Sequence, residues 1–215
     1  MKYEHLTYYS KTEEKLNVAS HAIGLVLSIS ALVLLMVKAA TYGTATHIVS
    51  FAIFGTSLLV MYAASTFYHY VQKPNWRKRL NIVDHAAIYV LIAGTYTPFT
   101  LVTLSGWLGW TIFGIVWGIA LVGVFFKLFY TGQYDKISTV AYVLMGWIII
   151  FAIKPLVENF PVKGLVWIFG GGGFYTIGAI LYSIKKIKYN HAIFHVFVLL
   201  GSFCHFMAVY FYVLN

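Results

Sequence analysis

The sequence predicts an all-α membrane protein, a bundle of seven transmembrane helices. Of its 215 residues 60% are hydrophobic and only 10% are charged, and the mean hydropathy is +0.80. A soluble domain cannot bury so much apolar surface, so a lipid bilayer must be the main solvent. A spanning helix needs about 20 mostly apolar residues. Seven such stretches fill most of the chain, at roughly 17–37, 46–71, 82–104, 107–129, 137–155, 163–184 and 190–213.

The first apolar stretch is predicted to be a retained helix and not a cleaved signal peptide. The tail before it mixes Glu4, Glu13 and Glu14 with lysines, and the run from 17 to 37 exceeds the about 7–15 residues of a signal h-region. We therefore expect a short cytoplasmic tail over residues 1–16, followed by a single seven-helix transmembrane domain over residues 17–215.

Lysine and arginine are distributed unevenly between the two sides of the predicted bundle. If the chain crosses at every stretch, 12 of the 15 lie on the side of the N-terminus and three on the other. The positive-inside rule then places the N-terminus in the cytoplasm and the C-terminus outside. A net charge of +9 can also indicate a nucleic-acid partner, but these charges lie between apolar spans, so we expect no nucleic acid.

Polar residues inside the predicted spans gather at one depth. The second stretch ends with 65–69, Ser-Thr-Phe-Tyr-His, the third begins with 81–85, Asn-Ile-Val-Asp-His, and the seventh begins with His191 and His195. All lie within about 10 Å of the inner boundary at helical rise. Ionisable residues in a membrane span are costly, so each of these is a functional candidate.

The histidines in this layer have the spacing of a metal site. His191 and His195, four residues apart, share one helix face and lie about 6 Å apart along it, so both can bind one ion. His69 would add a third nitrogen, and three histidines plus a water form the open arrangement of a catalytic zinc site. Asp84 lies at a suitable depth to hold or deprotonate that water, and Ser65 shares the face of His69.

Two of these residues also have purely structural interpretations. With Asn81 as N-cap, Asp84 would lie at N3, where a carboxylate complements the helix dipole. In the structural interpretation of Ser65, its hydroxyl would donate a hydrogen bond to the backbone carbonyl of Met61, four residues earlier. For Asp84 the structural and chemical roles are compatible.

Other polar residues are interpreted outside the metal set. His205 lies about 21 Å further along its helix than His191 and is therefore excluded. A solvated helix entrance explains the start of the first stretch, with Glu14, Asn17 and His21, more simply than direct ligation does. Cys204 is the only cysteine, which excludes an intrachain disulfide and a cysteine-based metal cage.

Two glycine-containing segments are given structural roles. The run 170–173 lies in an apolar span and lacks the Gly-Lys-Ser/Thr of a phosphate loop, so close packing or a kink explains it better. The segment 94–99, Gly-Thr-Tyr-Thr-Pro-Phe, predicts a proline-kinked stretch of the third helix, where the lost hydrogen bond permits a local rearrangement.

The motifs of the chain form one set: Glu14-x-x-Asn17-x-x-Ser20-His21, Ser65-x-x-x-His69, Asp84-His85, the run 93–99, His191-x-x-x-His195 and the run 201–206. Over all seven predicted helices this set closely resembles the hemolysin III proteins, the bacterial branch of the progestin and adiponectin receptor family. The resemblance implies a cytoplasmic N-terminus and zinc held by His69, His191 and His195, with Ser65 and Asp84 beside the water on the metal. The wider superfamily includes alkaline ceramidases, which resemble zinc-dependent lipid amidases. This chain differs from the receptor branch in its short N-terminal tail. The short tail leaves little room for a cytosolic signalling partner.

The leading hypothesis is a zinc-dependent hydrolase of a lipid amide or ester, with one zinc ion and a membrane lipid as substrate or ligand. Asp84 would orient the water and accept its proton, and Ser65 would support Asp84 or the developing oxyanion. Two alternatives from other classes are a membrane-permeabilising cytolysin and a non-enzymatic lipid regulator or receptor with structural zinc. We expect a multi-pass protein of the bacterial cell membrane.

Overall fold

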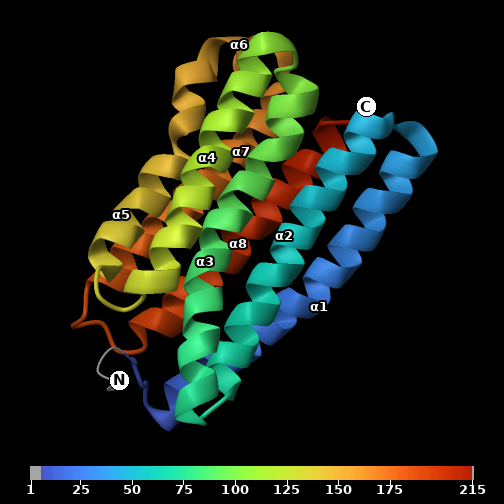
Figure 1. Cartoon of the computed structure of the whole chain (residues 1–215). Helices are drawn as coiled ribbons and strands as arrows, with labels where there is room; N and C mark the ends of the chain where they lie inside the picture. Colours follow the sequence, from blue (N-terminus) through green and yellow to red (C-terminus); the bar gives the residue numbers. More distant parts are fainter. Residues whose placement is uncertain (1–5, 215) are drawn as a thin grey trace.

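The computed structural model describes residues 6–214 and shows a bundle of long helices lying side by side (Figure 1). Seven helical segments are long and apolar enough to cross a membrane, which confirms the predicted seven-helix fold. No strand occurs between residues 6 and 214. The fifth segment is α5 and α6 joined by a 3₁₀ turn, Ile148–Ala152. The helices are α1 (Lys11–Tyr42), α2 (Ala45–Tyr70), α3 (Pro74–Pro98), α4 (Gly106–Tyr130), α5 (Asp135–Gly146), α6 (Ile153–Asn159), α7 (Val162–Ser183) and α8 (Asn190–Tyr212).

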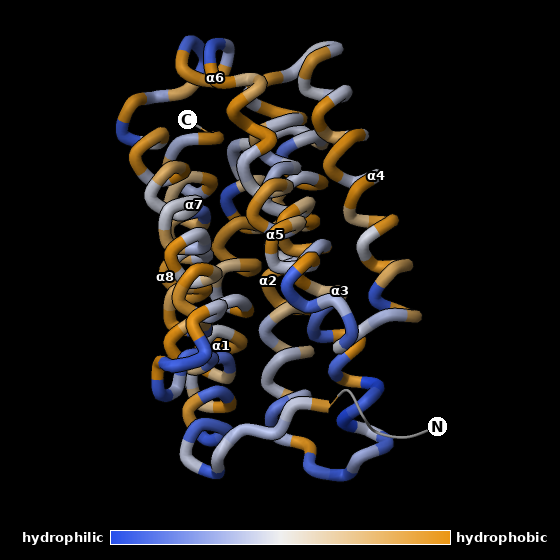
Figure 2. Tube along the Cα trace, turned by 90° about the vertical axis from the view of Figure 1, so that its left-hand side faces the viewer, coloured by the Kyte–Doolittle hydropathy of each residue, from blue (hydrophilic) through white to orange (hydrophobic). Residues whose placement is uncertain are grey.

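Residues 6–10 and the loops 71–73, 131–134 and 184–189 lie at one end of the bundle, which we call the basic end. The C-terminus lies at the opposite end (Figure 1). Figure 2 shows hydrophobic positions along the lengths of the helices and a concentration of hydrophilic positions at the basic end. That the basic end faces the cytoplasm stays a prediction from the charge distribution.

The helices pack in a way that leaves part of the interior open. α1 packs against α2 and α8, α2 against α3, α3 against α4, and α7 against α8. α5 makes smaller contacts with α3 and α7. Fully buried Leu35, Phe51 and Phe54 fill the space around α1 and α2, whereas a cavity lies among α3, α5, α7 and α8.

Two helices begin earlier than the sequence predicts. The hydroxyl of Ser10 accepts a hydrogen bond from an N–H in the first turn of α1, at 3.2 Å, so this helix starts well before residue 17. α3 starts at Pro74, because proline fits the first turn, where its missing N–H has no intrahelical partner. Asn81 and Asp84 therefore lie in the interior of α3, and the helix-cap interpretation of this pair is wrong.

The rearrangement predicted at Pro98 takes the form of a wider helical turn. α3 continues into a π-helical turn, Phe99–Thr103, before the chain reverses at Ser105, whose φ is 37°. Near the proline, the hydroxyls of Thr97 and Thr100 donate to carbonyls four residues back, at 2.9 and 3.0 Å. These side chains satisfy backbone acceptors where the helix geometry changes.

The four-glycine run in α7 provides close packing at one position. A Cβ on Gly171 would lie 2.7 Å from Nε2 of His205, so only a hydrogen fits there. By contrast, a Cβ on Gly170 would meet nothing closer than 4.0 Å, and one on Gly173 nothing within 4 Å. The run thus lets α7 approach α8, in agreement with the close-packing interpretation.

Candidate metal centre

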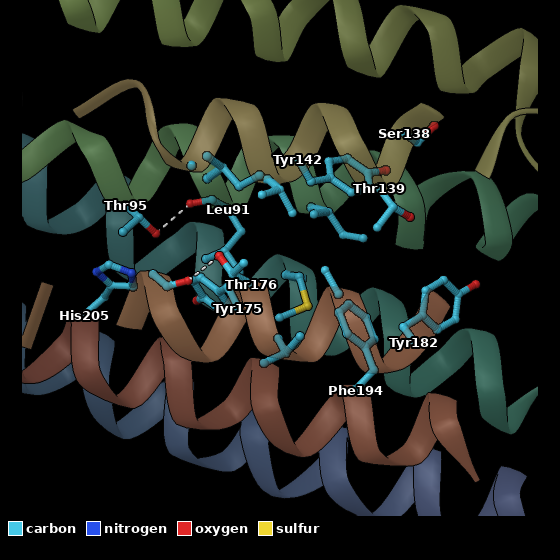
Figure 3. A pocket seen from close by; sticks show the side chains of 18 of the residues that line it. Leu91, Thr95, Ser138, Thr139, Tyr142, Tyr175, Thr176, Tyr182, Phe194 and His205 are labelled. Atoms are coloured by element: carbon cyan, nitrogen blue, oxygen red, sulfur yellow. Dashed lines mark hydrogen bonds between the residues drawn. The ribbon is translucent and has the colours of Figure 1, made fainter. Parts of the chain in front are cut away.

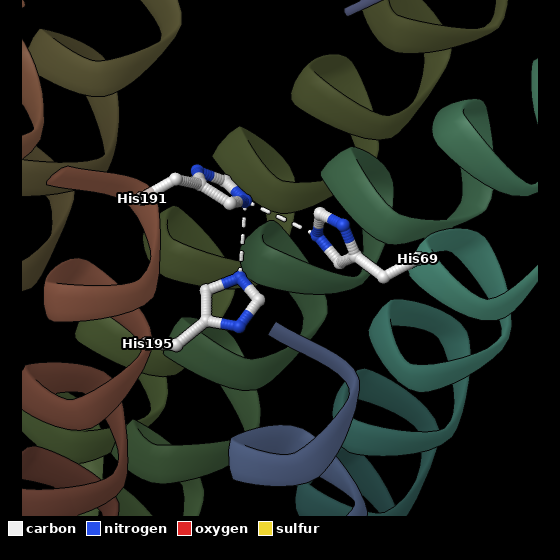
Figure 4. A group of neighbouring side chains, drawn as sticks. All are labelled: His69, His191 and His195. Carbon is white, nitrogen blue, oxygen red and sulfur yellow. Dashed lines mark hydrogen bonds between the residues drawn. The ribbon is translucent and has the colours of Figure 1, made fainter. Parts of the chain in front are cut away.

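Three buried imidazoles converge near the basic end of the bundle (Figure 4). His69 comes from the last turn of α2, and His191 and His195 come from the first two turns of α8. Nε2 of His191 lies 3.1 Å from Nε2 of His69 and 3.0 Å from Nε2 of His195. The three residues are 1%, 9% and 2% exposed, in the order His69, His191 and His195. Folding therefore brings together the three histidines that the sequence singles out.

Two of these rings are bonded to α1 through their outer nitrogens. Nδ1 of His69 donates to the carboxylate of Glu14 at 2.7 Å. Nδ1 of His195 lies 3.4 Å from the carbonyl oxygen of Asn17 and 3.3 Å from the hydroxyl of Ser20. A neutral ring that donates through Nδ1 carries its lone pair on Nε2. Such partners fix the tautomer and the orientation of histidines that bind metals.

The three Nε2 atoms suit a metal ion. Because Nδ1 of His69 and Nδ1 of His195 are engaged with α1, the Nε2 lone pairs of these two rings remain available to a cation. Separations of 3.0 and 3.1 Å are close to the ~3.3 Å between two nitrogens bound tetrahedrally to zinc at ~2.0–2.1 Å. Within the described residues, no cysteine or carboxylate joins this group. The set can therefore hold a metal ion through three nitrogens.

A buried ion pair fixes the carboxylate that bonds to His69. Arg77, in the first turn of α3, is fully buried and pairs with Oε1 of Glu14. Its guanidinium lies 4.8 and 4.7 Å from the ring centres of Tyr8 and Tyr68. The two aromatic rings and the carboxylate together compensate for the burial of this charge.

The start of α1 is not the solvated entrance that we expected from the sequence. Glu14, Asn17 and His21 are 9%, 0% and 3% exposed. Their spacing of three and four residues places them on one helix face, and this is the signal that could have identified them. Arg77 had no such signal, because in the sequence it is one of several basic residues after α2.

Tyr9, which precedes α1, covers the cluster from the side of the basic end. The ring of Tyr9 stacks on that of His191, with centroids 4.5 Å apart and planes inclined by 15°. The phenol is partly buried, and desolvation raises the pKa of Tyr9 well above its ordinary value. The hydroxyl is therefore neutral at physiological pH and adds no charge beside the histidines.

A cavity of about 170 Å³ extends from the cluster into the bundle (Figure 3). Most of its other lining side chains are apolar or aromatic. In Figure 3, Tyr182 and Ser138 lie toward one end of the cavity and His205 and Thr95 toward the other. The titratable side chains in its lining include His21, Asp84, His85, Asp135, His191 and His195, and Ser65 also borders it.

Asp84 and Ser65 border this cavity but stand outside the group of ligand atoms. Asp84 is 8% exposed, and its Oδ2 lies 3.9 Å from Nδ1 of His85. Ser65 is 1% exposed. In the described part of the chain its hydroxyl makes no hydrogen bond to the carbonyl of Met61, so the back-bonded interpretation of Ser65 is wrong. Both side chains are available to a molecule in the cavity.

Comparison with known proteins identifies the family to which the chain belongs. The model of the family described as "Haemolysin-III related" matches residues 9–206. The chain is 48% identical to "Hemolysin-3" of Bacillus cereus over 94% of its own length and 92% of that protein. It is 49% identical to "Hemolysin-3 homolog" of Bacillus subtilis (strain 168), over 93% and 94%. A more distant relative is the human "Monocyte to macrophage differentiation factor", 27% identical over 74% of this chain and 68% of that protein. The chain therefore belongs to the Haemolysin-III related family, as a multi-pass membrane protein of a bacterium.

Proposed function

We propose that this protein is a zinc-dependent hydrolase that cleaves an amide or ester bond of a membrane lipid at the inner leaflet. The observation that carries the proposal is the convergence of three imidazole nitrogens beside a largely apolar cavity. Three protein nitrogens leave one position of a tetrahedral ion open, as in catalytic zinc sites, whereas structural zinc usually has four protein ligands.

His69, His191 and His195 would hold the ion. When bound, zinc would polarise the carbonyl of the lipid and lower the pKa of a water molecule toward about 7. Glu14 and Asn17, on the outer nitrogens of two of the rings, would keep those rings oriented and raise their basicity as ligands. Imidazole also binds copper, iron and nickel, so the identity of the bound metal has to be measured.

Asp84 would orient the attacking water, accept its proton and transfer that proton to the leaving nitrogen or oxygen. The carbon–nitrogen or carbon–oxygen bond then breaks, and the products are a fatty acid and an amine or alcohol. Ser65 would donate a hydrogen bond to Asp84 or to the carbonyl oxygen as negative charge develops there. The position of both side chains on the cavity wall supports these roles.

The cavity suits the acyl chain of such a lipid. Leu91, Ile92 and Val198 contribute apolar surface to its wall. The cluster lies near the basic end, so a lipid that reacts there would keep its headgroup close to that end while its acyl chain lies in the cavity.

Metal analysis and untargeted lipidomics of the same preparations test the proposal. We expect about one zinc per wild-type chain and its loss in the double variant His191→Ala, His195→Ala. His47→Ala, at the opposite end of α2, is the matched control and should retain zinc. Membranes with the wild-type protein should contain a fatty acid product that is missing with Asp84→Ala. Unchanged zinc in the double variant would refute the site, and identical lipid profiles would refute the hydrolysis.

A cytolysin is the second candidate, because two relatives carry the name hemolysin. Apart from His205, the buried acidic, basic and histidine side chains of the described spans lie toward the basic end, and most of the cavity lining is apolar or aromatic, unlike the lining of a water-filled pore. Dye release from liposomes distinguishes the two functions. Release that persists after all three histidines are replaced by alanine would favour the cytolysin.

A further inference from the structure

His21 is a buried histidine beside the metal centre that has no role in the chemistry described so far. It lies in α1, is 3% exposed and lines the cavity. Its ring is parallel to that of His195, with centroids 3.5 Å apart and planes inclined by 11°. Among the residues that the structure describes, neither ring nitrogen has a hydrogen-bond partner.

Two unsatisfied nitrogens in one buried ring are unusual, since buried polar groups in proteins are nearly always hydrogen-bonded. His69 and His195, next to it, both use Nδ1 in a hydrogen bond. A phenylalanine would fill the same space without desolvating polar atoms. The nitrogens of His21 are therefore best explained by a ligand that enters the cavity.

The geometry argues against His21 as a fourth metal ligand. Its nitrogens are outside the group formed by His69, His191 and His195. The ring of His21 is stacked face to face on the ring of His195, with centroids 3.5 Å apart. It therefore lies outside the plane of the His195 ring, in which Nε2 of His195 faces the other two histidines. A neutral imidazole in that place still carries one N–H donor and one acceptor.

The ring of His21 is also held in place. Tyr62 contacts it edge-on, with centroids 5.1 Å apart and planes at 87°. The hydroxyl of Tyr62 donates to that of Ser202 at 2.8 Å, which anchors the tyrosine on α8. A Cβ on Gly24 would lie 2.4 Å from the ring of Tyr62, so this glycine allows the tyrosine to approach α1. Donors that are fixed in this way are the ones that stabilise developing charge effectively.

We propose that His21 is a catalytic residue that donates a hydrogen bond to the carbonyl oxygen of the lipid. This inference rests on the proposed hydrolysis. When the oxygen of water bonds to the carbonyl carbon, the π electron pair of the C=O bond moves to the oxygen, and the N–H of His21 stabilises the negative charge there. The proton of the water goes to Asp84 and then to the leaving group. When the C=O bond re-forms, the bond to that group breaks. His21 stays neutral throughout and only donates a hydrogen bond.

The test uses His21→Phe, which keeps an aromatic ring without a donor, His21→Leu as a second apolar replacement, and His21→Gln, which restores a donor. His47→Phe at the far end of α2 is the control. The zinc-loaded full chain in detergent is assayed with a long-chain p-nitrophenyl ester and the matching p-nitroanilide. Zinc content and the affinity for a long-chain alkyl phosphonate, which mimics the tetrahedral anion, are measured in the same samples.

We expect His21→Phe and His21→Leu to retain about one zinc, and kcat to fall by about 10²–10³-fold, as after the loss of one oxyanion donor. Phosphonate binding should weaken, while KM stays near the wild-type value. His21→Gln should recover part of kcat, and His47→Phe should equal the wild type. If the wild type is active and the His21→Phe variant is equally active, the role of His21 is overturned while the proposed hydrolysis stands. Loss of zinc in both apolar variants also overturns it, because His21 would then belong to the metal site. A wild type that holds zinc but cleaves neither probe overturns the proposed hydrolysis and, with it, this inference.

Discussion

The carboxylate of Glu14 accepts a hydrogen bond from Nδ1 of His69 at 2.7 Å, across 55 positions of the sequence. It orients the ring so that Nε2 faces the other two imidazoles. Partners of this kind typically change metal affinity by about 10–100-fold when they are removed. We expect Glu14→Gln to weaken zinc binding by this factor while the protein remains folded, as measured by competition with a chromogenic chelator. Glu13→Gln removes the same charge from the neighbouring position and should leave the affinity unchanged. Equal affinities of the two variants would contradict the role of Glu14.

Arg77 is expected to contribute strongly to stability through the same carboxylate. Arg77→Met would leave Glu14 buried without its cation, and breaking a buried ion pair in this way costs about 3–5 kcal/mol. The unfolding temperature in detergent should therefore fall clearly. The double variant Arg77→Met, Glu14→Gln should recover part of this loss, because no uncompensated charge remains. A double variant that is less stable than Arg77→Met would contradict this explanation.

The sequence predicts the seven helices and the meeting of the three histidines because both depend on local patterns. Apolar stretches of membrane length are visible directly, and His191 and His195 are separated by one helical turn. The third nitrogen, on His69, follows from matching depth in the bilayer. Depth is a sound guide here because the loop between α2 and α3 is short and both helices pack together.

What the sequence does not predict depends on burial and on contacts between distant helices. Arg77 and Glu14 look like ordinary charged residues near a membrane surface, and only packing among α1, α2 and α3 shows that they form a pair. Asp84 resembles a helix-cap residue until α3 is seen to begin at Pro74. The two ring nitrogens of His21 without a hydrogen-bond partner can likewise be recognised only in a structure, since a sequence does not show which polar atoms lack a partner.

The orientation in the membrane can be tested with the lysines near the two ends of α7. Lys163 lies near its start and Lys186 follows its end, and both are exposed. With the basic end in the cytoplasm, a membrane-impermeant maleimide should label Lys163→Cys in intact cells and Lys186→Cys only after lysis. The native Cys204 is 5% exposed, so the background is low. The reverse labelling pattern would overturn the predicted orientation.

Gly24 is expected to be essential for the contact between α1 and α2. A Cβ there would lie 2.4 Å from the ring of Tyr62 and 2.8 Å from the side chain of Leu199. Overpacking of this kind typically costs about 1–3 kcal/mol, so Gly24→Ala should lower the unfolding temperature. At Gly118, in α4, a Cβ would meet nothing within 4 Å. Gly118→Ala should therefore be neutral or slightly stabilising, since alanine favours a helix by about 1 kcal/mol. Similar unfolding temperatures for the two variants would contradict the packing.

Zinc is expected to stabilise the folded protein through the three histidines. A ligand that binds only the native state adds about 2.7 kcal/mol at 100 times its dissociation constant. The Nε2 atoms of His191 and His69 lie 3.1 Å apart, so one metal ion can bind both and link α8 to α2. The unfolding temperature should therefore fall after chelation and return when zinc is added. His69→Ala should abolish this response, and Glu14→Gln should shift it to higher zinc concentration, because it weakens affinity without removing a ligand. His47→Ala should respond like the wild type. A zinc response that survives in His69→Ala would mean that the stabilising metal binds elsewhere in the chain.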